Sequence, residues 1–199
     1  MDAPRTLIVE DEFAVAMELE DHLDALGYRV VDHVMTGRDA VERAADTVPD
    51  LILMDVHLDG PMDGVEAARH IRAAHPVPIV FVTAYSDDET LQRVADTAAV
   101  GYVVKPFDER ELYATLEVAL QTHALQQDVA RANDALRELL DGLRDGVALV
   151  DADGDLLFVN DPAARLLDTA PEQAAGRPWW QVLTVHADAQ ATLREWMEA

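Results

Sequence analysis

Residues 51–55 of the sequence read Leu-Ile-Leu-Met-Asp, four apolar residues followed directly by one acid. An unbroken apolar run of this length is typical of a central parallel strand, because helices cover both of its faces. Asp55 then lies at the carboxyl end of that strand, and open α/β sheets bind their ligands beyond the carboxyl ends of the strands. The stretch therefore predicts a parallel α/β sheet with a functional group at Asp55.

Three other apolar segments of the sequence also end at polar residues. The residues at their ends are Glu10, Asp11, Thr83 and Lys105, of which Lys105 is the only lysine in the chain. Because parallel strands bring their carboxyl ends to one edge of the sheet, we expect these groups to surround Asp55. Acids, a hydroxyl and an ammonium group around one aspartate indicate a site that takes up a phosphoryl group with a divalent metal ion.

The composition limits the class of protein. The chain has 199 residues, half of them hydrophobic, which suggests one domain and a second piece. It has no cysteine, which excludes disulfides, thiolate metal sites and cysteine nucleophiles. The formal net charge of −24 argues against a direct nucleic-acid partner, since binding a polyanion requires a basic face. With no signal peptide and no long apolar run, we expect a cytoplasmic protein that does not contact a membrane.

Strand and helix patterns alternate through the first part of the chain. Thr36 is suited to cap a helix that Pro49 ends. The expected inner face of this helix consists of Ala40, Val41, Ala44, Ala45 and Val48. An earlier helix is expected where Ala16, Leu19, Leu23 and Leu26 recur at helical spacing before Gly27, and further helices at 63–74, at 87–98 and from residue 108. Five strands alternating with five helices imply parallel pairing with right-handed crossovers.

These residues resemble the response-regulator receiver domain of two-component signalling. The resemblance covers about residues 6–123 and depends on Glu10-Asp11, Asp55, Thr83 and Lys105, each at the end of its own strand. It implies a flavodoxin-like (βα)5 fold, a doubly wound parallel sheet with the strand order 2-1-3-4-5.

The resemblance also implies how the acids act. Asp55 is the expected phosphoacceptor, which attacks a phosphohistidine on a sensor histidine kinase or a phosphotransfer protein. Mg²⁺ is the expected cofactor, held by Glu10, Asp11 and Asp55 together with the main-chain carbonyl of His57. Without the metal ion, several acids packed together would repel the incoming phosphoryl group.

Three further residues match the positions of the family that respond to phosphorylation. Thr83 and Lys105 are expected to contact the phosphoryl oxygens. Tyr102, three residues before Lys105, matches the aromatic residue that forms a switch with Thr83. The loop after the phosphoacceptor is one residue longer than the usual form, which resembles receivers that are joined to sensory modules.

Residues 108–144 contain no proline and almost no glycine, which predicts one long helix. Its first turns should pack on the sheet. A second apolar stripe follows with alternating spacings of four and three, at Val118, Thr122, Leu125, Val129, Ala132, Leu136, Leu139 and Leu143. This heptad pattern predicts a left-handed two-stranded coiled coil and therefore a homodimer. The alternative is a single amphipathic helix packed on its own domain.

The last part of the chain changes period again. Two apolar segments flank the turn sequence at 151–154, which indicates a hairpin. Asn160 can cap a short helix. The inner residues of that helix are expected to be Ala163, Ala164, Leu166 and Leu167. The region resembles the opening of a PAS domain, an α+β fold, with Asn160, Glu172, Gly176 and Leu183 in keeping with that family. We expect an incomplete domain, because the sequence reaches Ala199 before the three further strands of the fold.

The sequence therefore predicts three parts: a receiver domain at 1–122, a helical coiled-coil linker at 123–145 and an incomplete PAS-like domain at 146–199. The predicted function is a response regulator that relays its phosphorylation state through a dimeric helix to the PAS module. We expect no enzyme activity beyond its own phosphorylation and dephosphorylation. One alternative is a passive dimerisation or sensor scaffold. Another is a magnesium phosphatase of the haloacid dehalogenase type, which requires an aspartate where His57 stands.

Overall fold

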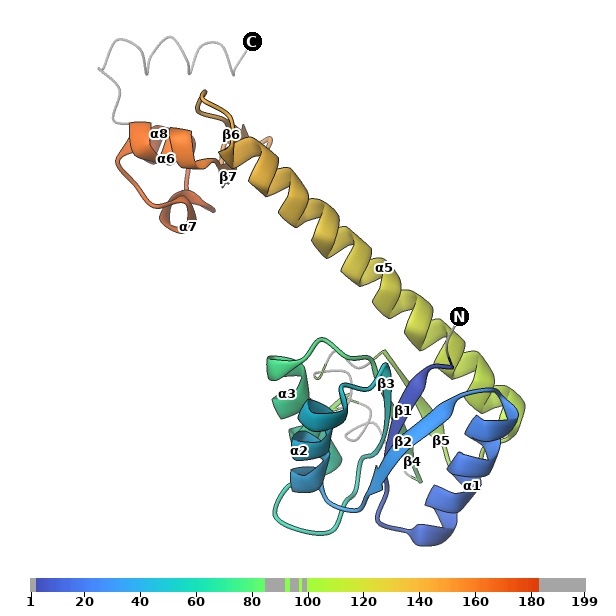
Figure 1. Cartoon of the computed structure of the whole chain (residues 1–199). Coiled ribbons are helices and arrows are strands. Elements are labelled where there is room, and N and C mark those ends of the chain that lie inside the picture. The colour runs from blue at the N-terminus through green and yellow to red at the C-terminus, as the bar shows by residue number, and fades with distance from the viewer. Residues whose placement is uncertain (1–2, 85–91, 94–96, 98–99, 183–199) are drawn as a thin grey trace. The chain divides into compact units, whose positions relative to one another are not determined.

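The structure is a computed structural model that describes residues 3–84, 92–93, 97 and 100–182. Most of the helix predicted at 87–98 therefore lies outside the described residues, as does Leu183. The chain forms two compact units, residues 1–127 and 128–199 (Figure 1). The predicted domain boundaries after residues 122 and 145 stay a prediction. None of the described helices is long and apolar enough to cross a membrane.

A five-stranded sheet forms the centre of the first unit. Its strands are β1 (Arg5–Val9), β2 (Arg29–Val34), β3 (Leu51–Asp55), β4 (Ile79–Thr83) and β5 (Gly101–Val104). They follow the order β2-β1-β3-β4-β5, and every neighbouring pair is parallel. This order confirms the predicted flavodoxin-like fold. Strands β3 and β4 are buried along their whole length, as their unbroken apolar runs predict.

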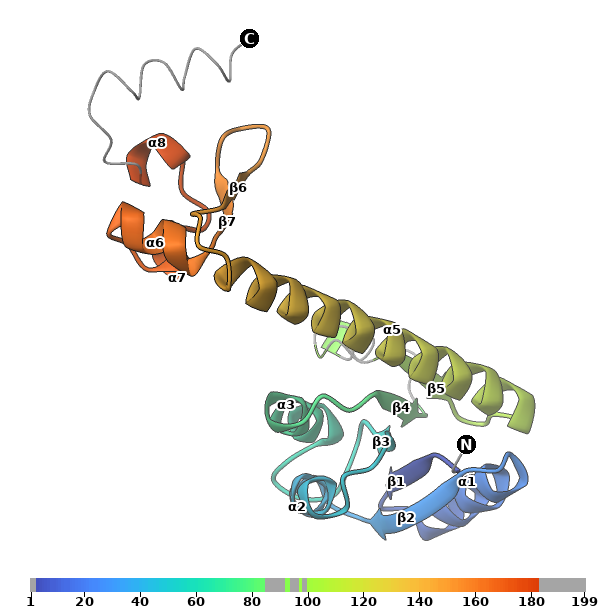
Figure 2. The ribbon, with the colours of Figure 1, turned by 45° about the horizontal axis from the view of Figure 1, so that its top comes forward.

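Helices cover both faces of this sheet (Figures 1 and 2). They are α1 (Phe13–Ala25), α2 (Gly37–Thr47), α3 (Gly64–Ala74) and α5 (Glu109–Asp141). Alternate residues of one strand reach opposite faces, so Leu53 packs in one core with residues of α1 and α5. Ile52 and Met54 pack in the other core with residues of α2 and α3. A site can form beyond the carboxyl ends of these strands.

The predicted inner face of α2 was wrong at Ala45 and Val48, which are both exposed. Ala45 lies next to the buried Ala44, about 100° further around the helix. Helix α2 ends at Thr47, and Val48 takes the left-handed conformation with a φ of 45°. The guanidinium of Arg5 donates to the main-chain oxygens of both residues, at 2.6 Å for Thr47 and 3.0 Å for Val48. The helical period therefore stops before the position at which it would bury Val48.

Helix α5 is continuous over 33 residues, which confirms the single long helix expected in this part of the chain. Its buried residues are Leu112, Leu116 and Ala119, all near its amino end. Most of the predicted heptad stripe is exposed instead: Val118, Leu125, Val129, Leu136 and Leu139. Leu143 is also exposed and lies beyond the last residue of the helix. The coiled coil stays a prediction.

The second unit contains the expected hairpin and capped helix. Strands β6 (Ala148–Val150) and β7 (Leu156–Val159) pair antiparallel and lead into α6 (Asp161–Leu167), α7 (Pro171–Ala174) and α8 (Trp179–Val182). A small core includes Leu156, Val159, Ala163, Ala164 and Trp179. The prediction that Leu166 faces this core was wrong, because it is exposed. Leu166 lies two residues after Ala164, about 200° around a helix that buries one face only.

Candidate functional site

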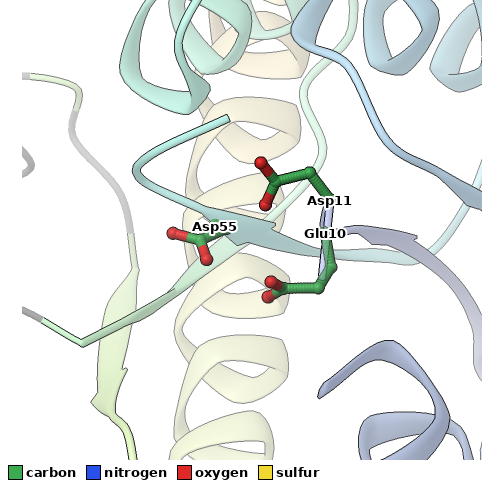
Figure 3. Close-up of side chains that lie close together, drawn as sticks. All are labelled: Glu10, Asp11 and Asp55. Carbon is green, nitrogen blue, oxygen red and sulfur yellow. The ribbon is translucent and has the colours of Figure 1, made fainter. Parts of the chain in front are cut away.

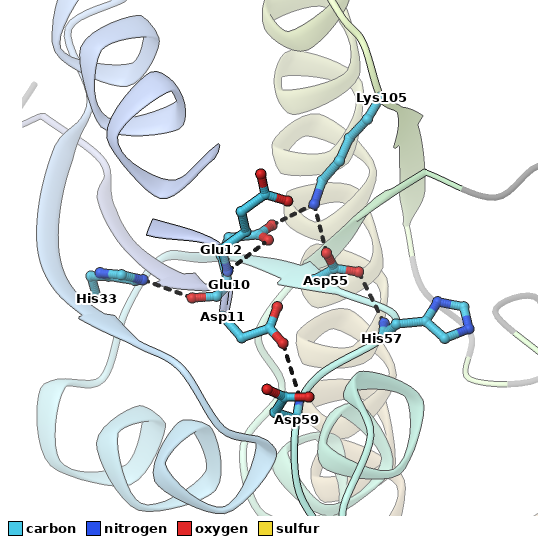
Figure 4. Close-up of polar contacts among 8 residues, drawn as sticks. All are labelled: Glu10, Asp11, Glu12, His33, Asp55, His57, Asp59 and Lys105. Atoms are coloured by element: carbon cyan, nitrogen blue, oxygen red, sulfur yellow. Dashed lines mark hydrogen bonds and ion pairs between the residues drawn. The ribbon is translucent and has the colours of Figure 1, made fainter. Parts of the chain in front are cut away.

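The carboxyl ends of β1, β3 and β5 bring three ionisable side chains into contact (Figure 4). Lys105 Nζ lies 2.6 Å from Asp55 Oδ2 and 2.7 Å from Glu10 Oε2. Glu10 directly follows β1, Asp55 ends β3 and Lys105 directly follows β5. The only lysine in the chain therefore bridges two carboxylates that are distant in sequence, as the parallel order of the strands requires.

Asp55 is held in place but is not sealed from solvent. Its Oδ1 accepts a hydrogen bond from the main-chain nitrogen of His57 at 2.9 Å, while Oδ2 accepts from Lys105. The side chain keeps 10% of its surface accessible. A carboxylate with both oxygens oriented and with part of its surface open can act as a nucleophile toward a bound group.

The charges of the site do not balance, since the ammonium faces more than one carboxylate. Burial raises the pKa of Glu10 to about 7, and the nearby Asp55 carboxylate raises it as well, against the hydrogen bond from Lys105. For Lys105, burial acts to lower the pKa, but the hydrogen bonds with Asp55 and Glu10 outweigh it and the pKa is raised. The ammonium is therefore stabilised, whereas the buried Glu10 carboxylate lacks sufficient positive charge around it.

Three acids of the site are close enough to share one cation (Figure 3). One oxygen each of Glu10, Asp11 and Asp55 lies within 4.8 Å of the other two, the only such group found among residues 3–84, 92–93, 97 and 100–182. Asp11 Oδ2 also accepts from the main-chain nitrogen of Asp59 at 3.1 Å, which orients it. Hard carboxylate oxygens in this number suit Mg²⁺, which takes oxygen ligands and keeps several waters. The excess negative charge fits the same ion.

The other residues predicted for the site lie around this cluster, and their individual roles stay predictions. The imidazole of His57 points away from the acids, while its main chain lies against Asp55 (Figure 4). Thr83 is buried at the end of β4, where its main-chain oxygen accepts from the nitrogen of Lys105 at 2.8 Å. Tyr102 on β5 is about half exposed.

Sequence reasoning missed two residues that shape the site. A Cβ added at Gly64 would lie 1.8 Å from the main-chain oxygen of Asp55, so only glycine fits where α3 begins behind β3. His33 Nε2 lies within hydrogen-bonding distance, 2.8 Å, of the main-chain oxygen of Glu10. A glycine near the start of a predicted helix is a signal for Gly64, because a helix former would otherwise be favoured there. Nothing in the local sequence points to His33.

Comparison with known proteins identifies the first unit. Residues 6–117, more than half of the chain, match the family described as response regulator receiver domain. The chain belongs to the response-regulator family. Residues 140–199 of this response regulator match the description PAS fold. Receiver domains of this family act in two-component signal transduction, bind Mg²⁺ through acidic residues and interact with histidine kinases or phosphotransfer proteins.

Curated relatives of this response regulator include two transcriptional regulatory proteins. It is 37% identical over 136 residues to PdtaR of Mycobacterium tuberculosis H37Rv, a match that covers 66% of either chain. It is 37% identical over 124 residues to ZraR of Escherichia coli K12, covering 61% of this chain and 28% of ZraR. The chain therefore spans just under two thirds of the first relative and less of the second.

Solved structures similar to this response regulator include receiver domains of larger proteins. The signal receiver domain of a modulated diguanylate cyclase from Desulfovibrio desulfuricans G20 is 38% identical, with a TM-score of 0.60 over 63% of this chain and 99% of that one. The N-terminal domain of a response regulator/sensory box/GGDEF protein from Carboxydothermus hydrogenoformans is 36% identical. Its TM-score is 0.57 over 61% of this chain and 98% of that one.

Proposed function

We propose that Asp55 accepts a phosphoryl group from the phosphohistidine of a sensor histidine kinase or phosphotransfer protein. The observation that carries this proposal is the position of Lys105 Nζ, 2.6 Å from Asp55 Oδ2, beside three acids that can share a cation. A carboxylate nucleophile needs positive charge on both sides of the incoming group, because that group is itself an anion.

The proposed step transfers the phosphoryl group from a histidine nitrogen to an oxygen of Asp55. An oxygen of Asp55 attacks phosphorus, a P–O bond forms as the P–N bond breaks, and the departing imidazole keeps the electron pair and takes up a proton. Glu10, Asp11, Asp55 and the main chain of His57 would hold Mg²⁺, which neutralises phosphoryl charge when bound. Lys105 supplies the second positive charge, and its contacts with Glu10 and Asp55 keep the amine directed into the site.

The proposed switch uses two residues of neighbouring strands. Thr83 is the last residue of β4, and Tyr102 is the second residue of β5, where it pairs with Phe81, two residues before Thr83. A phosphoryl group on Asp55 would draw the Thr83 hydroxyl toward it, which frees space for the half-exposed Tyr102 ring to turn inward. The surface around β5 and α5 would change as a result.

We further propose that α5 carries this change as a homodimer. Leu112 and Leu116 pack the helix on its own sheet, whereas the heptad stripe on its other side is open. Leu125 is 66% exposed and Leu139 is 71% exposed. Burying such a side chain contributes about 1.5–3 kcal/mol, so several layers would stabilise a two-stranded coiled coil. The exposure of these leucines supports a second copy as their partner over packing on the same domain.

Phosphorylation with a small phosphodonor tests the central step. The full chain is incubated with acetyl phosphate and Mg²⁺, and its molecular mass is measured by intact mass spectrometry. Wild type should gain one phosphoryl group, and Asp55→Asn should gain none. Omission of Mg²⁺ should strongly reduce the gain. A wild-type chain that stays unmodified, or an Asp55→Asn chain that gains the same group, would show that Asp55 is not the acceptor.

Two further measurements, phosphate-ester turnover and dimer formation, separate the two alternative functions. A phosphatase would release phosphate from an added phosphate ester over many turnovers, and it needs an acid–base group two residues after the nucleophile. His57 occupies that position with its imidazole directed away from Asp55 (Figure 4). We therefore expect no sustained phosphate release. A passive scaffold would form the same dimer in wild type and Asp55→Asn, with or without phosphodonor, whereas the relay predicts a phosphorylation-dependent change in wild type only.

A further inference from the structure

Asn160 is the most highly connected buried polar side chain described in the second unit. It is fully buried, and its amide makes four hydrogen bonds. Oδ1 accepts from the main-chain nitrogens of Val147 at 2.8 Å and Ala163 at 3.0 Å. Nδ2 donates to the main-chain oxygens of Leu140 at 2.7 Å and Asp145 at 3.1 Å. The side-chain amide of Asn160 therefore binds several separate segments of the chain.

These bonds join three segments. Leu140 belongs to the last turn of α5, where carbonyl oxygens lack helical partners, and Ala163 belongs to the first turn of α6, where nitrogens lack them. Asp145 and Val147 lie in the connector between α5 and β6. The predicted role of Asn160 was only the cap of α6, which requires the acceptor but not the two donated bonds.

The connector itself has the composition of a hinge. Residues 142–147 include two glycines, Gly142 and Gly146, and form no helix or strand. The structure nevertheless fixes this segment closely, since a Cβ added at Gly146 would lie 3.0 Å from the Cα of Ala163. A further hydrogen bond, which does not involve Asn160, also holds α5 to α6: the main-chain nitrogen of Asp161 donates to Asp141 Oδ1 at 2.8 Å. Without these hydrogen bonds, the connector could bend and a movement of α5 would not be transmitted to α6.

We propose that Asn160 is a positioning residue that makes the last turn of α5 and the PAS-like unit move as one body. The inference rests on the proposed relay through α5. In this proposal, the signal enters the PAS-like unit through the two hydrogen bonds that Asn160 donates. The cap of α6 alone would hold α6 but would leave α5 free to turn against it.

The tryptophans give a readout that belongs to the second unit alone. All three tryptophans of the chain follow α5, at positions 179, 180 and 196. Tryptophan emission of the full chain is therefore recorded before and after addition of beryllofluoride and Mg²⁺, with ¹⁹F NMR of bound beryllofluoride as an independent measure of occupancy at the first unit. Wild type should bind the analogue and change its emission.

Two variants separate the donated bonds from the cap. N160D and N160S keep a side-chain oxygen that can accept from Ala163, but both lack the amide Nδ2 that donates to Leu140 and Asp145. Both should bind beryllofluoride as wild type does and keep the starting emission of a folded unit, while the emission change is lost. D141A removes the hydrogen bond from the Asp161 nitrogen at an exposed position and should reduce the change without abolishing it.

Each outcome bears on a different part of the account. A full emission change in N160D and N160S would overturn the role of Asn160 while leaving the relay intact. A wild-type chain that binds beryllofluoride without any emission change would overturn the relay, and the proposed joint with it. If neither Asn160 variant keeps the folded starting emission, D141A decides, and a response equal to that of wild type would contradict the joint.

Discussion

In the receiver unit, the buried carboxylates of Glu10 and Asp55 carry charge that their neighbours do not balance, whereas in the PAS-like unit the buried amide of Asn160 is neutral and fully bonded. Lys105 faces Glu10 and Asp55 with Asp11 nearby, and the pKa of Glu10 is raised to about 7 by burial and then by Asp55. Asn160 satisfies its acceptor and both donors. The first arrangement is prepared for an ion and an anionic group, and the second for fixed geometry.

The largest expected effect on stability comes from removing the ammonium group of Lys105. Lys105→Met leaves two buried carboxylates without their cation and should lower the free energy of unfolding by about 3–5 kcal/mol in the absence of Mg²⁺. Urea denaturation measures it. Adding Glu10→Gln to this variant should restore part of the loss, because it removes one of the facing charges. A variant as stable as wild type would mean that the carboxylates are already neutral.

The next test compares two glycines, one in each unit. Gly64→Ala places a methyl group 1.8 Å from the rigid main chain of Asp55 and should cost about 3 kcal/mol of stability, together with much of the phosphorylation rate. Gly146→Ala meets Ala163 at 3.0 Å and should cost less. Thermal unfolding ranks the two. Equal costs would indicate that the loop behind Asp55 yields more easily than its contacts suggest.

A third test separates the two faces of α5. Leu116→Ala removes a buried side chain from the receiver core and should destabilise folding by about 2–5 kcal/mol. Leu125→Ala alters an exposed residue of the heptad stripe, so folding of the receiver unit should be unchanged while dimer dissociation becomes at least about tenfold easier. Analytical ultracentrifugation measures the dimer. Leu166→Ala, an exposed leucine outside the stripe, is the control, and a dimer equally weakened by it would argue against the predicted seam.

The smallest expected effect compares the two helix caps. Asp63 accepts from the nitrogen of Glu66 at the start of α3. Burial acts to raise the pKa of Asp63, but the hydrogen bonds with Glu66 and Arg93 outweigh it, so the pKa is below its ordinary value of 3.8. A lowered pKa in the folded state stabilises the fold above the ordinary value, and this contribution is lost as the pH falls through the folded-state pKa.

Asp63→Asn is the matched variant, because it keeps the capping oxygen but cannot titrate. Wild type should lose about 1 kcal/mol more stability than this variant when the pH falls from 7 to about 3. Denaturation at several pH values measures the difference. The neutral cap at Asn160 has no such dependence of its own. Parallel curves for wild type and Asp63→Asn would show that the carboxylate form of Asp63 adds nothing to the cap.

The sequence was informative wherever one local pattern determines structure. The apolar run before Asp55 predicted a central strand, and the polar ends of the other runs predicted the groups that meet it. Long-range contacts had no such local signal. The closeness of Gly64 to the main chain of Asp55 depends on how the chain turns back behind β3. Asn160 could be predicted as a cap, but its bond to Leu140 joins residues twenty positions apart.

Helix ends were the other source of error. The helical period predicted that Val48 is buried, but the chain leaves the helix one residue earlier, where Arg5 binds the last main-chain oxygens. Leu166 fits a helical pattern of apolar residues, yet α6 has only seven residues and a single buried face. At Val48 the position of a neighbouring segment decides the outcome, and at Leu166 the single buried face of α6 does.

A crystal structure of the full chain with beryllofluoride and Mg²⁺ would show whether Asp55 is the acceptor. We expect a beryllium–oxygen bond to Asp55, the metal ion on oxygens of Glu10, Asp11 and Asp55, and the Lys105 amine turned toward the fluorines. An adduct on another side chain, or an ordered Asp55 that stays unmodified with the amine directed into solvent, would contradict it.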